Sequence, residues 1–161
     1  MAILHGLSNV KLFAMTAVEN HFKSLERMYL SAPVNQQLYN GITIKISNEK
    51  AELTLPVTEK FFHAASAIHG SVYFKMLDDA AFFAVNSIVT DVFVYTVSFN
   101  TQLLRPVSAG IIRSTGELKF KSVNLFIADS VLYDENGKLI GKGTGNFMRS
   151  KIELSEKIGY R

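Results

Sequence analysis

Apolar residues recur every three or four positions in the N-terminal part of the chain, along SNVKLFAMTAVENHFKSLERMYLS (residues 8–31). The apolar positions are Leu12, Met15, Val18, Phe22, Leu25, Met28 and Tyr29. This spacing predicts an amphipathic helix. Ser8 or Asn9 is expected to cap its N-terminus, and Pro33 lies just beyond its C-terminal end.

The next segments alternate apolar and polar residues, with the period of two that is typical of β-strands. GITIKIS (41–47) and KAELTLPV (50–57) flank a short turn, so we expect them to form a hairpin. Four longer strands are predicted at 92–105, 110–122, 125–134 and 138–149. Long strands with few breaks favour one antiparallel sheet over a sandwich of short strands.

A second helix is predicted at 70–88, after a loop at 58–69. Apolar residues occupy most of its circumference: Met76, Leu77, Ala80, Ala81, Phe83, Ala84, Val85 and Ile88. A helix with so narrow a polar stripe is nearly enclosed, and an antiparallel sheet must cover its apolar face. The pattern therefore predicts an α+β fold in which this helix packs against the sheet.

Two adjacent carboxyl groups, Asp78 and Asp79, interrupt this apolar helix. Neighbouring helical residues point about 100° apart, so one of the two can reach a pocket while the other meets solvent or a neighbouring group. A carboxyl in apolar surroundings has a raised pKa, as many general bases and nucleophiles do. The alternative is that both lie on the exposed stripe, with Lys75 as a salt-bridge partner.

The same helix begins with His69 and Gly70. A helix N-terminus exposes unpaired N–H groups and the positive end of the helix dipole, and glycine lets a ligand approach the backbone. Together these features can bind an oxyanion that develops during acyl transfer. The alternative is that Gly70 only permits a turn and that His69 is a core residue.

Composition narrows the function classes. The chain has 161 residues, 48% of them hydrophobic, with 17 basic against 14 acidic residues and a net charge of +3. It has no Cys, which excludes disulfides and thiolate zinc sites and fits a reducing cytoplasm. We find no basic block for nucleic acid, no bilayer-spanning apolar run, no secretory signal, and no metal or nucleotide motif. A cytoplasmic protein without metal, cofactor, nucleic-acid or membrane partner is expected.

Three segments carry a resemblance to a known family. HGSVYFKMLDDAAFFAVNS resembles the HGGxxxxLxDxAxxxAxNS signature of hotdog-fold acyl-CoA thioesterases of the phenylacetate-degradation type. SFNTQLLRPVSAG and LYDENGKLIGKGTGNFM resemble that family's Arg-Pro turn and closing hairpin. The resemblance implies one hotdog domain over 1–161, a curved sheet wrapped around a central helix, with a core at 41–149 and a helical extension at 1–35.

The resemblance also implies roles for individual residues. The Gly70 N–H would polarise the thioester carbonyl, and Asp78 would act as nucleophile or as base for water. Thr96 falls where the family often has a residue that holds the attacking water. His63 stands where relatives commonly have Asn, and Ser71 replaces the usual second Gly of the signature.

Substrate contacts are expected from residues around the same helix start and from basic side chains near strand ends. His69 and Ser71 would border the bound thioester, and Arg105 and Arg113 are candidates for the phosphates of coenzyme A. Lys121 and Arg149 are further candidates, although a basic residue near a strand end is usually just solvated.

The spacing of Gly70 and Asp78 predicts a site shared between subunits. Eight helical residues separate them, about 12 Å of rise, whereas a thioester carbon must lie about 3 Å from both nucleophile and oxyanion donors. The family pairs two hotdogs with antiparallel central helices, and a homodimer or a homotetramer (a dimer of dimers) is expected.

Two alternatives to an acyl-CoA thioesterase are kept. One is a hotdog dehydratase or hydratase, in which His63 or His69 would serve as base. The other is a non-catalytic hotdog that binds an acyl thioester. Phe74, Phe82 and Phe83 could line an acyl pocket, but we expect at least two of them to be core residues. His5 and His21 lie outside the segments that carry the resemblance, and we expect both to face solvent.

Overall fold

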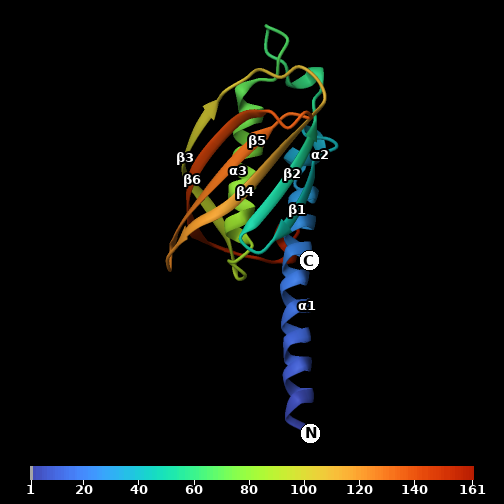
Figure 1. Cartoon of the computed structure of the whole chain (residues 1–161), viewed down its shortest axis with the longest axis vertical. Helices are drawn as coiled ribbons and strands as arrows, with labels where there is room; N and C mark the ends of the chain where they lie inside the picture. Colours follow the sequence, from blue (N-terminus) through green and yellow to red (C-terminus); the bar gives the residue numbers. More distant parts are fainter. Residues whose placement is uncertain (1) are drawn as a thin grey trace.

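A computed structural model describes the backbone of residues 2–161 and the side chains of residues 16–161. Its helices are α1 (Ala2–Ser31), α2 (Pro33–Gln37), α3 (Gly70–Asn86) and the short 3₁₀ turns η1 (Glu59–Phe61) and η2 (Glu156–Ile158). Its strands are β1 (Thr43–Ser47), β2 (Lys50–Pro56), β3 (Val92–Leu103), β4 (Ile111–Lys121), β5 (Leu125–Tyr133) and β6 (Leu139–Glu153). Figure 1 shows their arrangement.

The predicted order of elements is confirmed, with differences at the ends. β6 continues to Glu153, four residues beyond its predicted end, because it pairs with the start of β3 there. The sequence reading missed α2, a five-residue helix that begins at Pro33, where the fixed φ of proline suits the first turn. The predicted N-cap at Ser8 or Asn9 is wrong, because α1 already begins at Ala2 and both residues lie within the helix.

The six strands form one antiparallel sheet in the order β1-β2-β4-β5-β6-β3. The sheet curves around α3, which contacts all six strands (Figure 1). Alternate residues of β4 face the helix, and Gly116 allows the closest approach: a Cβ there would lie 2.0 Å from the carbonyl oxygen of Ala80. The predicted α+β fold, a curved sheet wrapped on a central helix, is confirmed.

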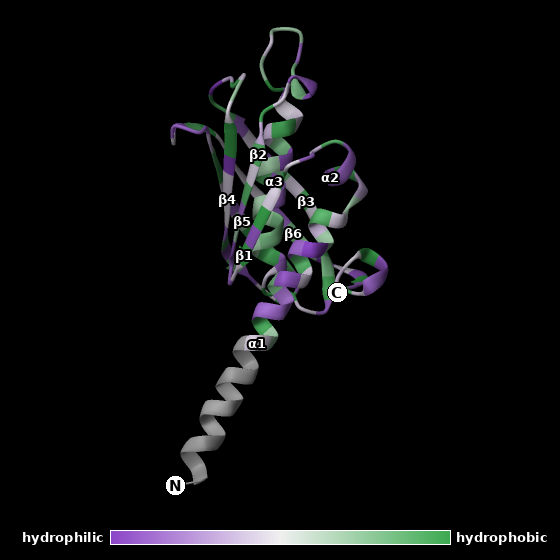
Figure 2. Ribbon diagram, turned by 90° about the vertical axis from the view of Figure 1, so that its right-hand side faces the viewer, coloured by the Kyte–Doolittle hydropathy of each residue, from purple (hydrophilic) through white to green (hydrophobic). Residues whose placement is uncertain are grey.

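The apolar face of α3 forms the centre of the core (Figure 2), where Met76, Leu77 and Ala80 have no exposed surface. Phe82 and Phe83 are also buried, whereas Phe74 is 44% exposed. The expectation that at least two of these three phenylalanines belong to the core is therefore confirmed.

His21 is buried, although the sequence reading placed it in solvent. It is 6% exposed, because both ring nitrogens find partners in the fold. Nε2 lies 3.0 Å from the carbonyl oxygen of Asn86 and Nδ1 lies 2.8 Å from the hydroxyl of Tyr160. A carbonyl can only accept, so Nε2 carries the proton and Nδ1 accepts from the tyrosine. The same expectation for His5 falls outside the described side chains.

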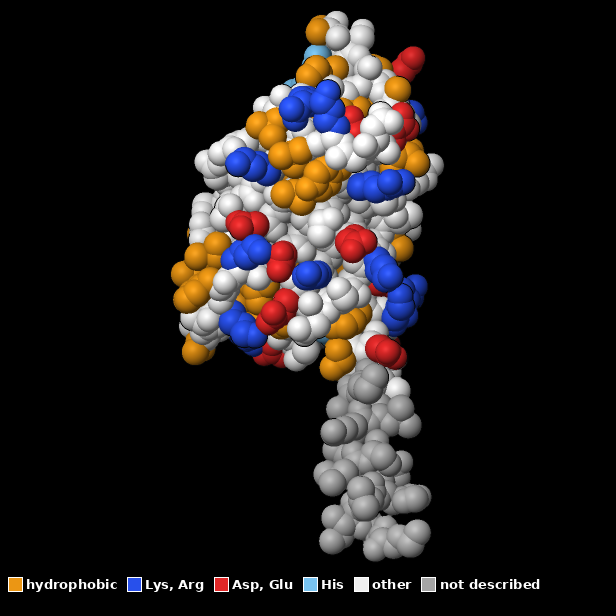
Figure 3. Space-filling model, viewed as in Figure 1, with side chains coloured by type: hydrophobic (Ala, Val, Ile, Leu, Met, Phe, Trp, Pro, Cys, Tyr) orange, Lys and Arg blue, Asp and Glu red, His pale blue; other side chains and the backbone are white. Residues whose placement is uncertain are grey.

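Acidic and basic side chains are interspersed on the face seen in Figure 3. Surface ion pairs include Lys121 with Glu49 of the β1–β2 turn, at 2.6 Å, and Lys119 with Glu117 on the same strand, β4, at 2.8 Å. Within the described residues, no helix is both long and apolar enough to cross a bilayer.

Candidate active site

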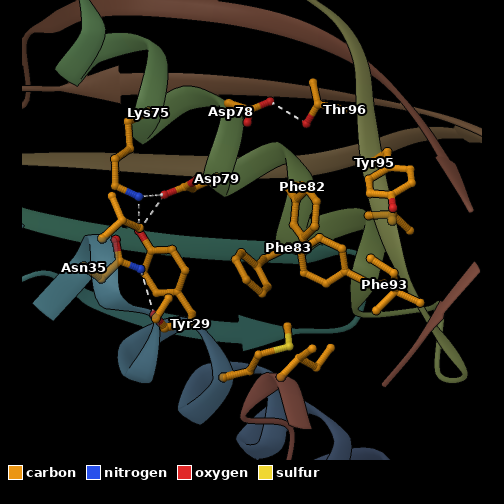
Figure 4. A pocket seen from close by; sticks show the side chains of 16 residues that line it. Tyr29, Asn35, Lys75, Asp78, Asp79, Phe82, Phe83, Phe93, Tyr95 and Thr96 are labelled. Carbon is orange, nitrogen blue, oxygen red and sulfur yellow. Dashed lines mark hydrogen bonds and ion pairs between the residues drawn. The ribbon is translucent and has the colours of Figure 1, made fainter. Parts of the chain in front are cut away.

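A cavity of about 500 Å³ lies beside the middle of α3, between that helix, β3 and the α1–α2 segment (Figure 4). The end of β6 and η2 complete its wall. The residues that line it are Met28, Tyr29, Ala32, Val34, Asn35, Lys75, Asp78, Asp79, Phe82, Phe83, Phe93, Val94, Tyr95, Thr96, Ile152 and Ile158. Most of the wall is apolar, and its charged residues, Lys75, Asp78 and Asp79, all come from α3.

Asp78 and Thr96 meet at this cavity. The Thr96 hydroxyl donates a hydrogen bond of 3.0 Å to Oδ1 of Asp78, joining the middle of α3 to β3 (Figure 4). The pKa of Asp78 is raised from 3.8 to about 6, mainly by burial and to a smaller extent by the nearby Asp79. The Thr96 hydrogen bond and the Lys75 charge act in the opposite direction. Asp78 is thus a partly desolvated carboxyl that is still ionised at neutral pH.

Asp79 is held differently from its neighbour. Its Oδ2 lies 2.5 Å from the ammonium of Lys75, one turn earlier in α3, and accepts a 2.6 Å hydrogen bond from the Tyr29 hydroxyl. The Lys75 ammonium also lies over the rings of Tyr29 and Tyr39, at 5.1 and 4.8 Å from their centroids. One alternative was that both carboxyls are exposed and that Lys75 is their salt-bridge partner. Lys75 does pair with Asp79, but this pair is largely buried.

Gly70 is the first residue of α3, at the far end of the helix from the sheet's β1–β2 turn (Figure 1). Its amide N–H has no hydrogen-bond acceptor among the described residues. His69 precedes it as the N-cap, and its Nδ1 accepts a 3.1 Å hydrogen bond from the Ser71 N–H. A Cβ on Gly70 would lie 3.0 Å from Leu103 Cδ1, so glycine keeps this N–H accessible beside β3.

A second cavity, of about 310 Å³, brings Gly70 together with His63 and Arg105. His63 Nδ1 accepts a 3.0 Å hydrogen bond from the Ala65 N–H, which leaves the proton of the neutral ring on Nε2. The Arg105 guanidinium donates to the Leu139 carbonyl. A hydrogen-bond donor at His63 therefore stands near the free N–H of Gly70.

The remaining predicted residues lie elsewhere. His69 and Ser71 line a third cavity, of about 280 Å³, against η1 and the segment after α2. Arg113 is exposed and lies on β4 between two residues that face α3, so it projects from the opposite side of the sheet. Within one chain, the structure thus joins Asp78 to Thr96 and Gly70 to His63 and Arg105, but does not bring these two groups together.

Several residues of the main cavity were missed by sequence reasoning. Lys75 is not among them, because the sequence suggested it as a salt-bridge partner of the aspartates, and its four-residue spacing on the helix favours Asp79. Nothing in the local sequence marks Tyr29 or Ile158 as neighbours of α3. Within the described part of the chain, no group of three or more His, Asp or Glu side chains could hold a metal ion.

Comparison with known proteins connects this geometry to a family. Residues 65–140, which include all of α3, match the family model of the thioesterase superfamily. The chain has the hotdog fold of the thioesterase superfamily. The resemblance found in the sequence is confirmed, and the matched superfamily supports hydrolysis of acyl thioesters as a general activity.

Solved structures agree with this assignment of the fold. The PaaI protein of the Escherichia coli phenylacetic acid degradation operon is 19% identical, with a TM-score of 0.76 over 85% of this chain and 98% of its own. A phenylacetic-acid-degradation-related protein from Ralstonia eutropha JMP134 is 25% identical, with a TM-score of 0.69 over 80% of this chain and 98% of its own.

A thioesterase from Haemophilus influenzae is 19% identical, with a TM-score of 0.68 over 76% of this chain and 85% of its own. A comparison with curated proteins gives no match.

Proposed function

We propose that this hotdog protein hydrolyses acyl-CoA thioesters to a carboxylic acid and free coenzyme A. The observation that carries the proposal is the Asp78–Thr96 pair: a carboxyl with a pKa near 6, hydrogen-bonded at 3.0 Å and bordering an apolar cavity. Such a carboxyl is ionised at neutral pH but basic enough to take a proton from water. The match to the thioesterase superfamily supports the choice of reaction.

In the proposed reaction, Asp78 removes a proton from a water molecule that Thr96 helps to hold. The water oxygen adds to the thioester carbonyl carbon, and the negative charge that develops on the carbonyl oxygen is stabilised by an N–H at a helix N-terminus. The tetrahedral intermediate collapses with cleavage of the C–S bond, and the leaving thiolate takes up the proton. Direct attack by the Asp78 carboxylate, followed by hydrolysis of the resulting anhydride, gives the same products.

The oxyanion donor is proposed to be Gly70 of the partner subunit. The Gly70 N–H has no acceptor among the described residues, as an oxyanion site requires. Eight residues of α3 separate it from Asp78, about 12 Å along the helix axis, and the two residues line different cavities. An antiparallel dimer of central helices would place Gly70 of one chain near Asp78 of the other, twice per dimer.

The other predicted residues have supporting roles in this proposal. His63 lines the Gly70 cavity and would donate from Nε2 to the carbonyl or to water. Arg105 borders the same cavity and would meet a phosphate of coenzyme A, with Arg113 as a more remote candidate. His69 and Ser71 would hold the helix start in place, since the imidazole caps the Ser71 N–H.

The proposal extends to the surroundings of the site. Residues 41–149 would form the hotdog core and residues 1–35 a helical extension, in a homodimer or a dimer of dimers. A cytoplasmic location would suit an acyl-CoA substrate and the lack of Cys.

The first experiment measures release of free thiol from a panel of acyl-CoAs, with wild type, Asp78→Asn and Asp79→Asn. We expect Asp78→Asn to lose at least a hundredfold in kcat/KM, because an amide cannot deprotonate water, and Asp79→Asn to lose far less. Equal losses in both variants would contradict the roles assigned here. Conversion of the acyl group without thiol release would indicate a hydratase instead, and binding without turnover a non-catalytic protein.

A second experiment tests the shared site. Asp78→Asn and Gly70→Leu, each inactive alone, are refolded together at equal ratio. A mixed dimer has one site with Gly70 from the first variant and Asp78 from the second, so random pairing should restore about a quarter of wild-type activity. Mixed dimers confirmed by mass spectrometry but without activity would show that the two residues do not share a site.

A further inference from the structure

Seven of the sixteen residues that line the cavity beside Asp78 lie outside residues 65–140, the region that matches the thioesterase superfamily. Met28, Tyr29, Ala32, Val34 and Asn35 come from α1, α2 and their junction, and Ile152 and Ile158 come from the end of β6 and η2. The reactive carboxyl is thus supplied by the matched region, while much of the wall that faces it is supplied by the flanking segments.

Figure 4 shows these two parts on opposite sides of the cavity, with Asp78 and Thr96 on one side and Tyr29 and Asn35 on the other. An acyl group whose carbonyl carbon lies at Asp78 would therefore extend between Phe82, Phe83 and the α1–α2 junction. A volume of about 500 Å³ falls in the range of pockets that enclose a whole small-molecule ligand. It greatly exceeds the volume of an acetyl group.

The charges at the cavity restrict the acyl group further. Among the described residues that line it, Lys75 is the one cation, and its ammonium is held by Asp79 and lies over two tyrosine rings. With Asp78 ionised, the lining carries two carboxylates and one ammonium. A carboxylate at the distal end of an acyl chain would meet net negative charge without a cation to pair with, and its desolvation would be unfavourable.

We propose that this cavity is the acyl-binding pocket, that it takes uncharged apolar acyl groups longer than acetyl, and that Ala32 and Val34 of the α1–α2 junction set the length it accepts. This inference rests on the proposed thioesterase function. Each methylene transferred from water into an apolar pocket contributes about fourfold to affinity. Specificity in kcat/KM should rise by up to that factor per CH₂ until the chain reaches the junction.

The test uses straight-chain acyl-CoAs from acetyl to dodecanoyl and, for the eight-carbon chain, the analogue that ends in a carboxylate. For wild type, kcat/KM should rise steeply from acetyl upward, and the carboxylate analogue should be at least tenfold poorer than octanoyl-CoA. Ala32→Phe, which narrows the cavity, should lower kcat/KM for long chains at least tenfold more than for acetyl. Val34→Phe acts on the same wall from a position that is 45% exposed, and serves if Ala32→Phe fails to fold.

The matched control is Ala17→Phe, the same substitution on the exposed surface of α1, away from the cavity. It should show the wild-type chain-length profile. A flat profile in wild type, a preference for the carboxylate analogue, or an equal loss for all chain lengths in both wall variants would overturn the pocket assignment.

Calorimetric titration of Asp78→Asn with the same acyl-CoAs separates this inference from the reaction. Wild type could hydrolyse none of them, while the affinity of Asp78→Asn for them still rises with chain length and falls when Ala32→Phe is added. That result would support the pocket assignment and refute the proposed reaction. If wild type hydrolyses them all with no dependence on chain length, the reaction stands and the pocket fails.

Discussion

The desolvation of Asp78 predicts that replacing it will stabilise the protein while it removes activity. Burial raises the pKa of its carboxyl from 3.8 to about 6 in the folded protein. The folded state therefore holds the proton more tightly than the unfolded chain, so stability falls as the pH rises from about 4 to about 6. Above pH 6 the loss is complete and amounts to about 3 kcal/mol.

The variant Asp78→Asn keeps the size of the side chain and an acceptor for the Thr96 hydroxyl, but it cannot ionise. We expect its free energy of unfolding at pH 7 to exceed that of wild type by up to about 3 kcal/mol, and at pH 4 by only about 0.5 kcal/mol. Urea denaturation followed by circular dichroism, at one fixed protein concentration, measures both differences.

Asp79→Asn is the matched control, since it changes the neighbouring residue in the same way. It breaks the pair with Lys75 and leaves that ammonium buried, so we expect a loss of about 1–3 kcal/mol at pH 7. The opposite signs at adjacent positions test the geometry sharply. Asp78→Asn that is no more stable than wild type, or a stabilisation equal at pH 4 and pH 7, would refute the reasoning.

Three further variants test other contacts. Thr96→Val removes a hydrogen bond that lowers the pKa of Asp78, so the acidic limb of the pH profile of kcat/KM should move to higher pH; an unmoved limb would show that Asp78 is not the titrating group. Gly116→Ala would place a Cβ 2.0 Å from a carbonyl oxygen of α3, so we expect it to lower the free energy of unfolding in urea by about 3 kcal/mol. Gly141→Ala, whose Cβ would have contacts of 3.4 Å or more, should lower it much less. Similar losses in the two variants would show that α3 can shift to make room for the added methyl group. His21→Phe should lower the free energy of unfolding by about 2 kcal/mol at pH 7, because it removes two buried hydrogen bonds. Burial lowers the pKa of His21, so wild type should lose more stability than the variant as the pH falls below 6.5. Parallel curves of stability against pH would contradict a buried neutral imidazole.

The strands and the two long helices of this fold could be predicted because each one is encoded locally. The period of two in the strands, and the apolar residues three and four apart in the helices, follow from backbone geometry alone. The His-Gly pair before α3 and the aspartates within it could be placed on that helix by counting residues. Their chemical interpretation depended on the resemblance to thioesterases, since periodicity does not distinguish a buried carboxyl from an exposed one.

Tertiary structure decided how the two aspartates differ. Helix geometry predicted that they diverge, but the partners come from distant parts of the chain: Thr96 is 18 residues from Asp78, and Tyr29 is 50 residues from Asp79. The different surroundings of the two carboxyls arise only where β3 brings Thr96 to Asp78 and α1 brings Tyr29 to Asp79. No local pattern specifies those packing distances.

His21 shows the same limit. Its position in an amphipathic helix did not reveal that a carbonyl at the end of α3 and the hydroxyl of Tyr160, 139 residues away, would satisfy both ring nitrogens. The cavity is a third case, because residues 28–35 and 152–158 become its wall only when the fold brings these two segments beside α3. The sequence by itself thus determined the elements and the candidate reactive groups. Folding alone determined which groups are desolvated, paired or enclosed, because those properties depend on contacts between residues far apart in the chain.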